Sequence, residues 1–123
     1  MRHDPAIREA ADARGRQAEQ RAAAALAADG WAVLGQRVRT PAGELDLVAE
    51  RAGLLAFVEV KARTTLTDAA FALGAAQRAR LLRAAEWWMG ANPGPGAAGV
   101  RFDVVLVDAA GRLRRIVDAF RLE

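Results

Sequence analysis

The chain has 123 residues, which is enough for one domain with a hydrophobic core but too few for two. Hydrophobic residues make up 53% of it and charged residues 27%, a composition typical of a globular protein rather than a disordered one. It has no cysteine and one histidine, His3 near the N-terminus, so disulfides and thiolate metal sites are excluded and a histidine zinc site is not expected. Any bound metal would need oxygen ligands, which favours Mg²⁺ or Mn²⁺.

No apolar run approaches the roughly 20 residues that a membrane-spanning helix needs, and residues 1–13 lack the apolar core of a signal peptide. We therefore expect a cytoplasmic protein without a membrane partner. The formal net charge is +3, and 17 of the 18 basic residues are arginine. Arginine binds phosphate bidentately, which favours a nucleic-acid partner, although a GC-rich genome explains the arginines equally well. The only lysine is Lys61.

The elements follow one another without repeats along a single domain of residues 1–123. An alanine-rich helix is predicted over residues 5–29, with Pro5 in its first turn and Gly30 after its end. We then expect three strands, a second helix, a Pro- and Gly-rich flexible loop, a buried strand and a short edge strand, over residues 31–40, 44–50, 54–63, 74–89, 90–99, 101–108 and 113–117. Residues 1–4 are expected to be disordered.

This order of helix, three strands, helix and strand predicts an α/β fold with a mixed central sheet and helices packed on it. The first helix presents Gly15, Ala18, Ala22 and Leu26 at helical spacing, and the second presents Leu81, Leu82, Ala85, Trp88 and Met89. Trp87 and Trp88 are adjacent and cannot share one helix face. One of them should therefore lie in the core, and the other should be exposed for stacking or for an interface.

Two of the predicted strands carry the residues that suit chemistry. Side chains alternate between the faces of a strand, so Glu59 and Lys61 share one face. On the preceding strand, Glu44, Asp46 and Val48 share a face. A Glu-Val-Lys segment is also often no more than a solvated strand face, so the argument depends on how the two strands pair.

A two-residue turn at Ala52-Gly53 would pair Arg51 with Leu54. Counting back, Asp46 then lies opposite Glu59, and Glu44 lies opposite Lys61. The Cβ atoms of opposed residues are about 4.5–5.5 Å apart, and a slip of two residues would leave diagonal neighbours about 7–8 Å apart, still within reach of a shared ion.

Two carboxylates at this distance repel each other unless a cation lies between them. A magnesium ion held by Asp46 and Glu59, with the carbonyl of Val60 as a further ligand, would activate water and stabilise charge on a phosphodiester. Lys61 would orient the attacking water or help to deprotonate it, because lysine can change its pKa near a metal whereas arginine cannot usefully release its proton.

Two helical residues could complete such a site. Glu19 lies at the edge of the first helix's apolar face, where an ionised group is costly unless it is paired or bound to metal; it could equally be an ordinary surface glutamate. Gln77 points with the second helix's apolar stripe and could bond a phosphate or the attacking water, although such residues more often mark a helix boundary. Candidate contacts to a nucleic-acid backbone are Arg63, Arg78, Arg80 and Arg83, of which the helical three could simply be solvated.

Four blocks of the sequence resemble the YraN-like family of bacterial proteins, which is assigned to the restriction-endonuclease-like superfamily near the archaeal Holliday-junction resolvases. The blocks are Gly15-Arg-Gln-Ala-Glu19, Gly43-Glu-Leu-Asp-Leu-Val48, Phe57-Val-Glu-Val-Lys-Ala-Arg63 and Arg101-Phe-Asp-Val104. They occur in the family's order and approximate spacing, and the resemblance extends from about residue 15 to residue 120.

The resemblance implies a restriction-endonuclease-like core. It implies that Asp46 and Glu59 match the acidic metal ligands, that Lys61 matches the lysine of the superfamily signature, and that Glu19 matches a first-helix glutamate that supplements the site. The role of Glu44 is open. Gln77 stands where many relatives carry lysine, so a basic contact is missing there or is provided by Arg78. Ala18 stands where glycine is common, which matters for packing.

The leading hypothesis is an endonuclease that uses Mg²⁺ or Mn²⁺ and cuts DNA, including branched or recombining DNA. The sequence does not separate DNA from RNA, and a homodimer would suit a two-stranded substrate. One alternative is a nucleic-acid-binding module that does not hydrolyse its ligand. Another is a protein–protein adaptor that uses Trp87 or Trp88 at a partner surface.

Overall fold

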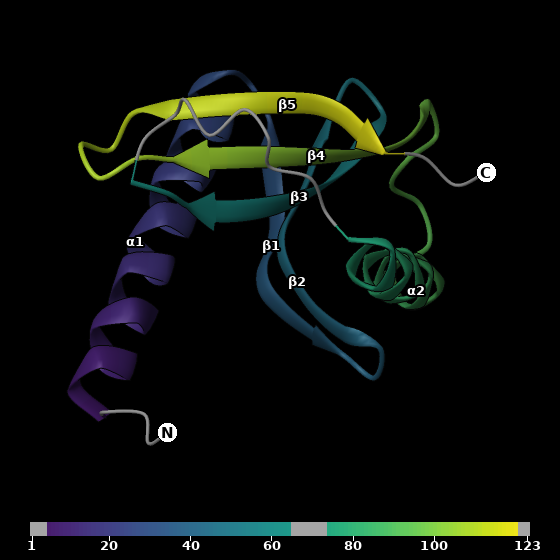
Figure 1. Cartoon of the computed structure of the whole chain (residues 1–123). Helices are drawn as coiled ribbons and strands as arrows, with labels where there is room; N and C mark the ends of the chain where they lie inside the picture. Colours follow the sequence, from purple (N-terminus) through teal and green to yellow (C-terminus); the bar gives the residue numbers. More distant parts are fainter. Residues whose placement is uncertain (1–4, 65–73, 121–123) are drawn as a thin grey trace.

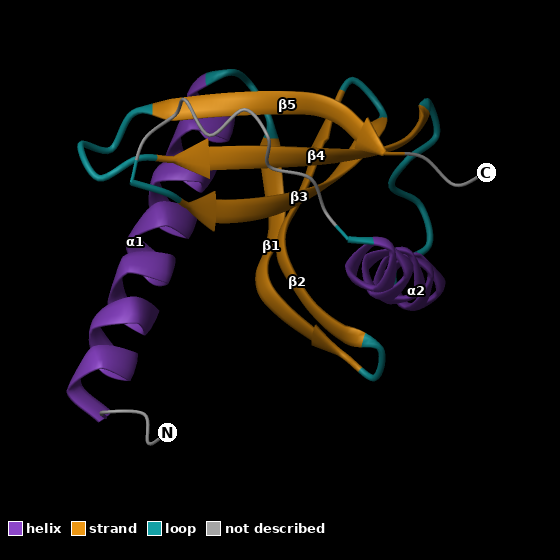
Figure 2. Cartoon of the chain, in the orientation of Figure 1, coloured by secondary structure: helices purple, strands orange, loops and turns teal. Residues whose placement is uncertain are grey.

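The computed structural model describes residues 5–64 and 74–120, which form a five-stranded sheet with one helix on each face (Figure 1). Figure 2 shows the same arrangement with helices and strands distinguished by colour. In chain order the elements are α1 (Pro5–Ala28), β1 (Ala32–Thr40), β2 (Gly43–Arg51), β3 (Leu54–Ala62), α2 (Ala75–Ala91), β4 (Gly99–Val107) and β5 (Leu113–Phe120).

The strands lie in the order β1-β2-β3-β4-β5, and all neighbours are antiparallel except β3 and β4. The parallel pair is joined by the segment that contains α2, because parallel neighbours need a long crossover. The predicted mixed sheet with packed helices is thus confirmed, and the fold is consistent with a restriction-endonuclease-like core. In Figure 1, β1 and β2 run steeply across the direction of β3, β4 and β5, so the sheet is strongly twisted.

Two hydrophobic layers hold the helices on the sheet. Small residues of α1, together with Leu26, pack on one face against residues that include Leu47, Val58 and Val60. The residues Leu81, Ala84, Ala85 and Trp88 of α2 pack on the other face, against Val48, Phe57 and Phe102 among others. Trp88 is buried and Trp87 is 45% exposed, which confirms that the adjacent tryptophans divide between core and surface.

β5 is longer than the predicted edge strand, which was expected to end at Val117. Asp118 adopts a left-handed backbone conformation (φ 56°), and its N–H donates to the carboxylate of Asp103. The chain then returns to the sheet, and Phe120 stacks on Phe102 with 4.7 Å between ring centroids. The buried Asp103 also accepts two hydrogen bonds from Arg101, so the Arg101-Phe-Asp segment stabilises the sheet.

The N-terminal residues and the two helices bear on the remaining expectations from the sequence. The predicted disorder of residues 1–4, and His3 with it, lies outside them. Within residues 5–64 and 74–120, neither helix has the length and apolar content required to cross a bilayer.

Candidate active site

The hairpin that joins β2 to β3 sets the register of the candidate site. Ala52 and Gly53 both have positive φ values, 51° and 78°, as a two-residue type I′ turn requires. Arg51 pairs with Leu54, and the pairing continues to Leu47 with Val58. The predicted turn and its register are therefore confirmed over this stretch.

The ladder between β2 and β3 stops just before the acidic residues. Beyond the Leu47–Val58 pair, the N–H of Val60 donates to Oδ2 of Asp46 at 2.8 Å. A side-chain carboxylate thus takes a hydrogen bond from β3 where the backbone ladder has ended. The predicted extension of this register to a Glu44–Lys61 pair is wrong, because the paired segment does not reach Glu44.

β2 also rotates at Asp46. Leu45 and Leu47 are two residues apart and should share a face, yet Leu47 packs on the α1 side of the sheet and Leu45 on the α2 side. Across from Asp46 on β1 lies Arg37, whose φ of 49° is unusual for a residue other than glycine. The predicted regular alternation of Glu44, Asp46 and Val48 is therefore wrong, because the strand is distorted between them.

Three carboxylates from α1 and β2 converge at this distortion. One oxygen atom from each of Glu19, Glu44 and Asp46 lies within 4.8 Å of the others, so the three side chains could hold a metal ion. The predicted ligand set was Glu19, Asp46, Glu59 and Val60. The structure brings together Glu19 and Asp46 and adds Glu44, whose role the sequence left open.

Arg37 supplies positive charge to this group. Its Nε lies 3.0 Å from Oε2 of Glu19 and 3.8 Å from Oε1 of Glu44. Sequence reasoning missed this residue because it is one arginine among 17 and carries no motif. Its neighbours depend on a backbone distortion that hydrophobic periodicity does not reveal.

A second group of polar side chains surrounds Glu59 on the α2 side. Lys61 Nζ lies 3.1 Å from Oε1 of Glu59, and Gln77 donates to the same oxygen at 3.2 Å. The carboxylates of Asp46 and Glu59 are close enough for the charge of Asp46 to raise the pKa of Glu59. Asp46 therefore links the Glu19–Glu44 pair to the Glu59–Lys61–Gln77 group.

Burial dominates the electrostatics of these acids. It raises the pKa of Glu59 to about 7, and the charge of Asp46 acts in the same direction while Lys61 opposes it. Burial also raises the pKa of Asp46, against the hydrogen bond from Val60, and the pKa of Glu19, again with help from the charge of Asp46. The pKa values of three neighbouring acids are thus all raised, chiefly by burial, even though Arg37 and Lys61 lie beside them.

A hollow of about 150 Å³ gives access to this cluster. Its walls include the carboxylates of Glu44, Asp46 and Glu59 together with Gln77 and Arg80. Among the arginines predicted to contact nucleic acid, Arg80 is the one that lines this hollow. Arg78 and Arg83 are exposed on α2, and Arg63 follows β3, where its guanidinium donates to the carbonyl of Ala62.

The residues at the convergence fit a hard divalent cation. Every side chain of the group offers carboxylate oxygen, the donor that magnesium and manganese prefer. Glu19 is only 8% exposed, and its Oε2 makes no hydrogen bond despite the nearby Arg37. The ion pair with Arg37 offsets part of the cost of burying this oxygen, and a bound cation would offset more of it. The donor set does not distinguish between the two metals.

Comparisons of the sequence with a protein-family model and with known proteins point to the same family. The family described as "Uncharacterised protein family UPF0102" matches residues 18–107, which include every residue of the candidate site. A UPF0102 protein of Granulibacter bethesdensis is 59% identical over 109 residues, covering 89% of this chain and 69% of that protein. UPF0102 proteins of Rhodopseudomonas palustris and of a Bradyrhizobium species are 51% and 47% identical, each over 86% of this chain and over 84% and 75% of their own lengths. The chain therefore belongs to the UPF0102 family.

Proposed function

We propose that this protein is a metal-dependent nuclease that hydrolyses phosphodiester bonds in DNA, with branched or recombining DNA as its substrate. The observation that carries the proposal is the convergence of the carboxylates of Glu19, Glu44 and Asp46. Glu44 and Asp46 share a hollow with Glu59, and the carboxylate of Glu59 pairs with Lys61. Acidic oxygens beside a lone ammonium group suit phosphoryl chemistry, in which charge on the phosphate must be stabilised and a water molecule must be activated.

The three converging carboxylates would hold Mg²⁺ or Mn²⁺. Either ion, when bound, would polarise a phosphoryl oxygen and lower the pKa of water. Asp46 is the central ligand because it contacts both groups of the site, and the N–H of Val60 fixes the position of its carboxylate. The coordination of the ion by Glu59 and by the carbonyl of Val60 stays a prediction.

Glu59 and the residues around it would take up the proton that the attacking water releases. In the metal-free protein the pKa of Glu59 is about 7, and a cation bound beside it would lower this pKa, so that its carboxylate would be ionised and able to accept a proton from an attacking water. Lys61 and Gln77 both hold Oε1 of Glu59, which fixes the direction of the carboxyl group. Lys61 is also placed to stabilise negative charge on a bound phosphate.

The proposal is tested by incubating the purified protein with a labelled four-way DNA junction and with its linear arms. We expect cleavage with Mg²⁺ or Mn²⁺, none with EDTA, and loss of cleavage in Lys61→Met, which keeps most of the side-chain length without the charge. Equal cleavage by the wild type and Lys61→Met would exclude this assignment, because contaminating nuclease would then explain the activity. An RNA substrate of the same shape tests whether DNA is preferred.

One observation favours the alternative of a binding module that does not hydrolyse nucleic acid. Arg37 already partly neutralises Glu19 and Glu44, as a resident cation would. In this alternative the site stays metal-free, and calorimetry would detect DNA binding but no magnesium binding.

The place of Arg37 leads to a prediction about metal affinity. Replacing it with glutamine removes a positive charge close to the ion, so Arg37→Gln should bind Mg²⁺ about ten-fold more tightly, a gain of about 1.4 kcal/mol. Isothermal titration calorimetry at pH 7.5 measures this. Arg39→Gln is the matched control, because it removes an exposed charge two residues along the same strand and should change the affinity little. Weaker binding by Arg37→Gln would show that Arg37 positions the ligands instead.

A further inference from the structure

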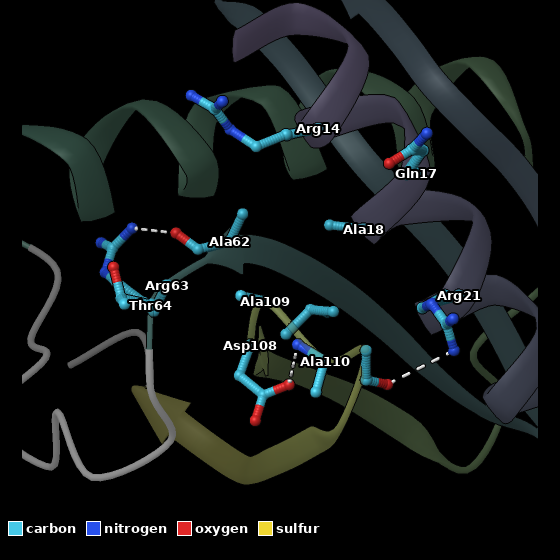
Figure 3. A pocket seen from close by; sticks show the side chains of 12 residues that line it. Arg14, Gln17, Ala18, Arg21, Ala62, Arg63, Thr64, Asp108, Ala109 and Ala110 are labelled. Carbon is cyan, nitrogen blue, oxygen red and sulfur yellow. Dashed lines mark hydrogen bonds between the residues drawn. The ribbon is translucent and has the colours of Figure 1, made fainter. Parts of the chain in front are cut away.

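A cavity of about 510 Å³ lies outside the candidate active site, between α1 and the ends of β3 and β4 (Figure 3). Arg14, Gln17 and Arg21 line it from α1, and Arg63 lines it from the end of β3. The turn between β4 and β5, which includes Gly111, forms its floor. It is more than three times as large as the hollow at the acidic cluster.

On two elements, α1 and β3, residues that line the cavity are sequence neighbours of residues in the candidate site. Ala18 lines it and directly precedes Glu19 on α1. Ala62 and Arg63 line it and directly follow Lys61 on β3. Successive side chains of a β-strand point to opposite faces, so a nucleic-acid strand whose scissile phosphate lay against Asp46 and Lys61 would pass around the end of β3 to place another phosphate in this cavity.

The charge of the cavity suits such a phosphate. Three arginines contribute to its walls, and Asp108 is the one acidic residue that lines it among those described. The carboxylate of Asp108 is bonded to the guanidinium of Arg112 at 2.8 Å and accepts backbone N–H groups of Ala110 and Arg112. Its negative charge is thus compensated locally, and the cavity keeps an excess of positive charge.

The guanidinium of Arg21 lies against the turn between β4 and β5. A Cβ atom added at Gly111 would collide with the guanidinium carbon of Arg21, so the guanidinium lies directly on the glycine backbone. One N–H of Arg21 also reaches the carbonyl of Gly111 at 3.5 Å. The positive φ of Gly111, 83°, gives a second reason for glycine here. The guanidinium of Arg21 is thus close to the turn, at the wall of the cavity.

We propose that this cavity binds a backbone phosphate of the substrate strand, outside the bond to be cut. The inference rests on the proposed nuclease function and adds the side of the molecule along which the strand runs, namely over α1 and the β4–β5 turn. Arg14, Arg21 and Arg63 contribute bidentate donors that match phosphate oxygens. Arg78 and Arg83 are exposed on α2, which packs on the other face of the sheet, and this path does not need them.

The test measures binding of a fluorescent four-way DNA junction by anisotropy in EDTA, where hydrolysis does not occur. The double variant Arg14→Gln/Arg21→Gln should bind about ten-fold more weakly, and the slope of log K against log salt should fall by about one, because the cavity neutralises a single phosphate. The matched control Arg39→Gln/Arg114→Gln removes the same charge from exposed positions on β1 and β5 that line neither the cavity nor the hollow, and it should change the affinity less than about three-fold. An equal or larger loss in the control would overturn the proposal, as would an unchanged affinity in the first variant.

Two further measurements identify the ligand and guard against misfolding. Arg21→Lys keeps the charge with a side chain that the cavity accommodates, and it should give an intermediate loss because lysine cannot bind phosphate bidentately. Inorganic phosphate should compete with DNA only weakly. The assignment to a strand would be overturned by two results together. Inorganic phosphate would compete strongly with DNA, and Arg14→Gln/Arg21→Gln would lose phosphate binding but keep DNA binding, which would identify a site for free phosphate.

These results separate the two proposals. If the wild-type protein binds no DNA, the nuclease function and the phosphate cavity are both excluded. If it binds and cleaves DNA while the cavity variants behave as the wild type does, only the cavity assignment fails.

Discussion

Replacing Asp46 with asparagine should lower metal-dependent DNA cleavage about a thousand-fold or more, a loss of about 4 kcal/mol of transition-state stabilisation. Asp46 is the carboxylate that contacts both the Glu19–Glu44 pair and Glu59, so its charge is needed for the metal and for the proton on Glu59. The folded protein should not be destabilised, because burial already raises the pKa of Asp46 and favours an uncharged side chain there. Asparagine can also accept the N–H of Val60. Single-turnover cleavage and thermal unfolding measure the two effects.

Glu50→Gln is the matched control for this experiment. Glu50 lies on the same strand as Asp46, and its carboxylate accepts one backbone hydrogen bond, from Gly96 at 2.8 Å. The substitution removes the same charge and keeps an acceptor, as Asp46→Asn does, so cleavage should stay within about two-fold of the wild type. Cleavage by Asp46→Asn at a rate close to that of Glu50→Gln would remove Asp46 from the mechanism.

Much of the fold follows from local pattern. Alanine-rich composition predicts α1, and the runs of strand-favouring residues predict β1 to β4, because burial of one face imposes a period on the sequence. The turn at Ala52-Gly53 is also predictable, since two-residue hairpin loops require positive φ and fix the register of the strands beside them. The approach of Asp46 to Glu59 could be expected from that register.

The rest of the site depends on departures from regular structure. Arg37 and Asp46 face each other where β1 and β2 are distorted, and this distortion brings Glu44 to Glu19. Strand periodicity assumes an undistorted ladder, so it placed Glu44 opposite Lys61 instead. Periodicity also fails to predict the length of β5. The strand continues to Phe120 past Asp118, whose backbone is left-handed and interrupts the regular strand conformation.

The burial of Glu19 depends on contacts between elements that are far apart in the sequence, so the local sequence does not predict it. The apolar face of α1 places Glu19 at its edge, which is compatible with a surface position or with a buried one. Only the packing of α1 over the sheet buries Glu19 to 8% exposure and turns it toward β2. The local sequence therefore identifies the candidate acids, and the tertiary structure decides which of them share a ligand.

The acidic cluster should make the metal-free protein less stable as the pH rises. Glu59 has a pKa of about 7 in the folded protein and an ordinary value of 4.5, and the pKa values of Glu19 and Asp46 are also raised. Between these two pH values the folded state binds more protons than the unfolded state, so stability is full below about pH 4.5 and falls until about pH 7. The difference at Glu59 corresponds to a loss of about 3 kcal/mol between pH 4.5 and pH 8. Urea unfolding in EDTA at several pH values measures it.

Two comparisons assign this loss to the cluster. Glu59→Gln should flatten the pH dependence, because its side chain cannot ionise and can still accept a hydrogen bond from Lys61. Magnesium should raise stability at pH 8 much more than at pH 5, because a cation competes with the protons that the same carboxylates bind at low pH. Asp108 does not interfere, since its lowered pKa acts below this range. A free energy of unfolding that rises from pH 5 to pH 8 in EDTA would contradict the raised pKa values. If magnesium raised the stability equally at pH 5 and pH 8, the ion would bind away from these carboxylates.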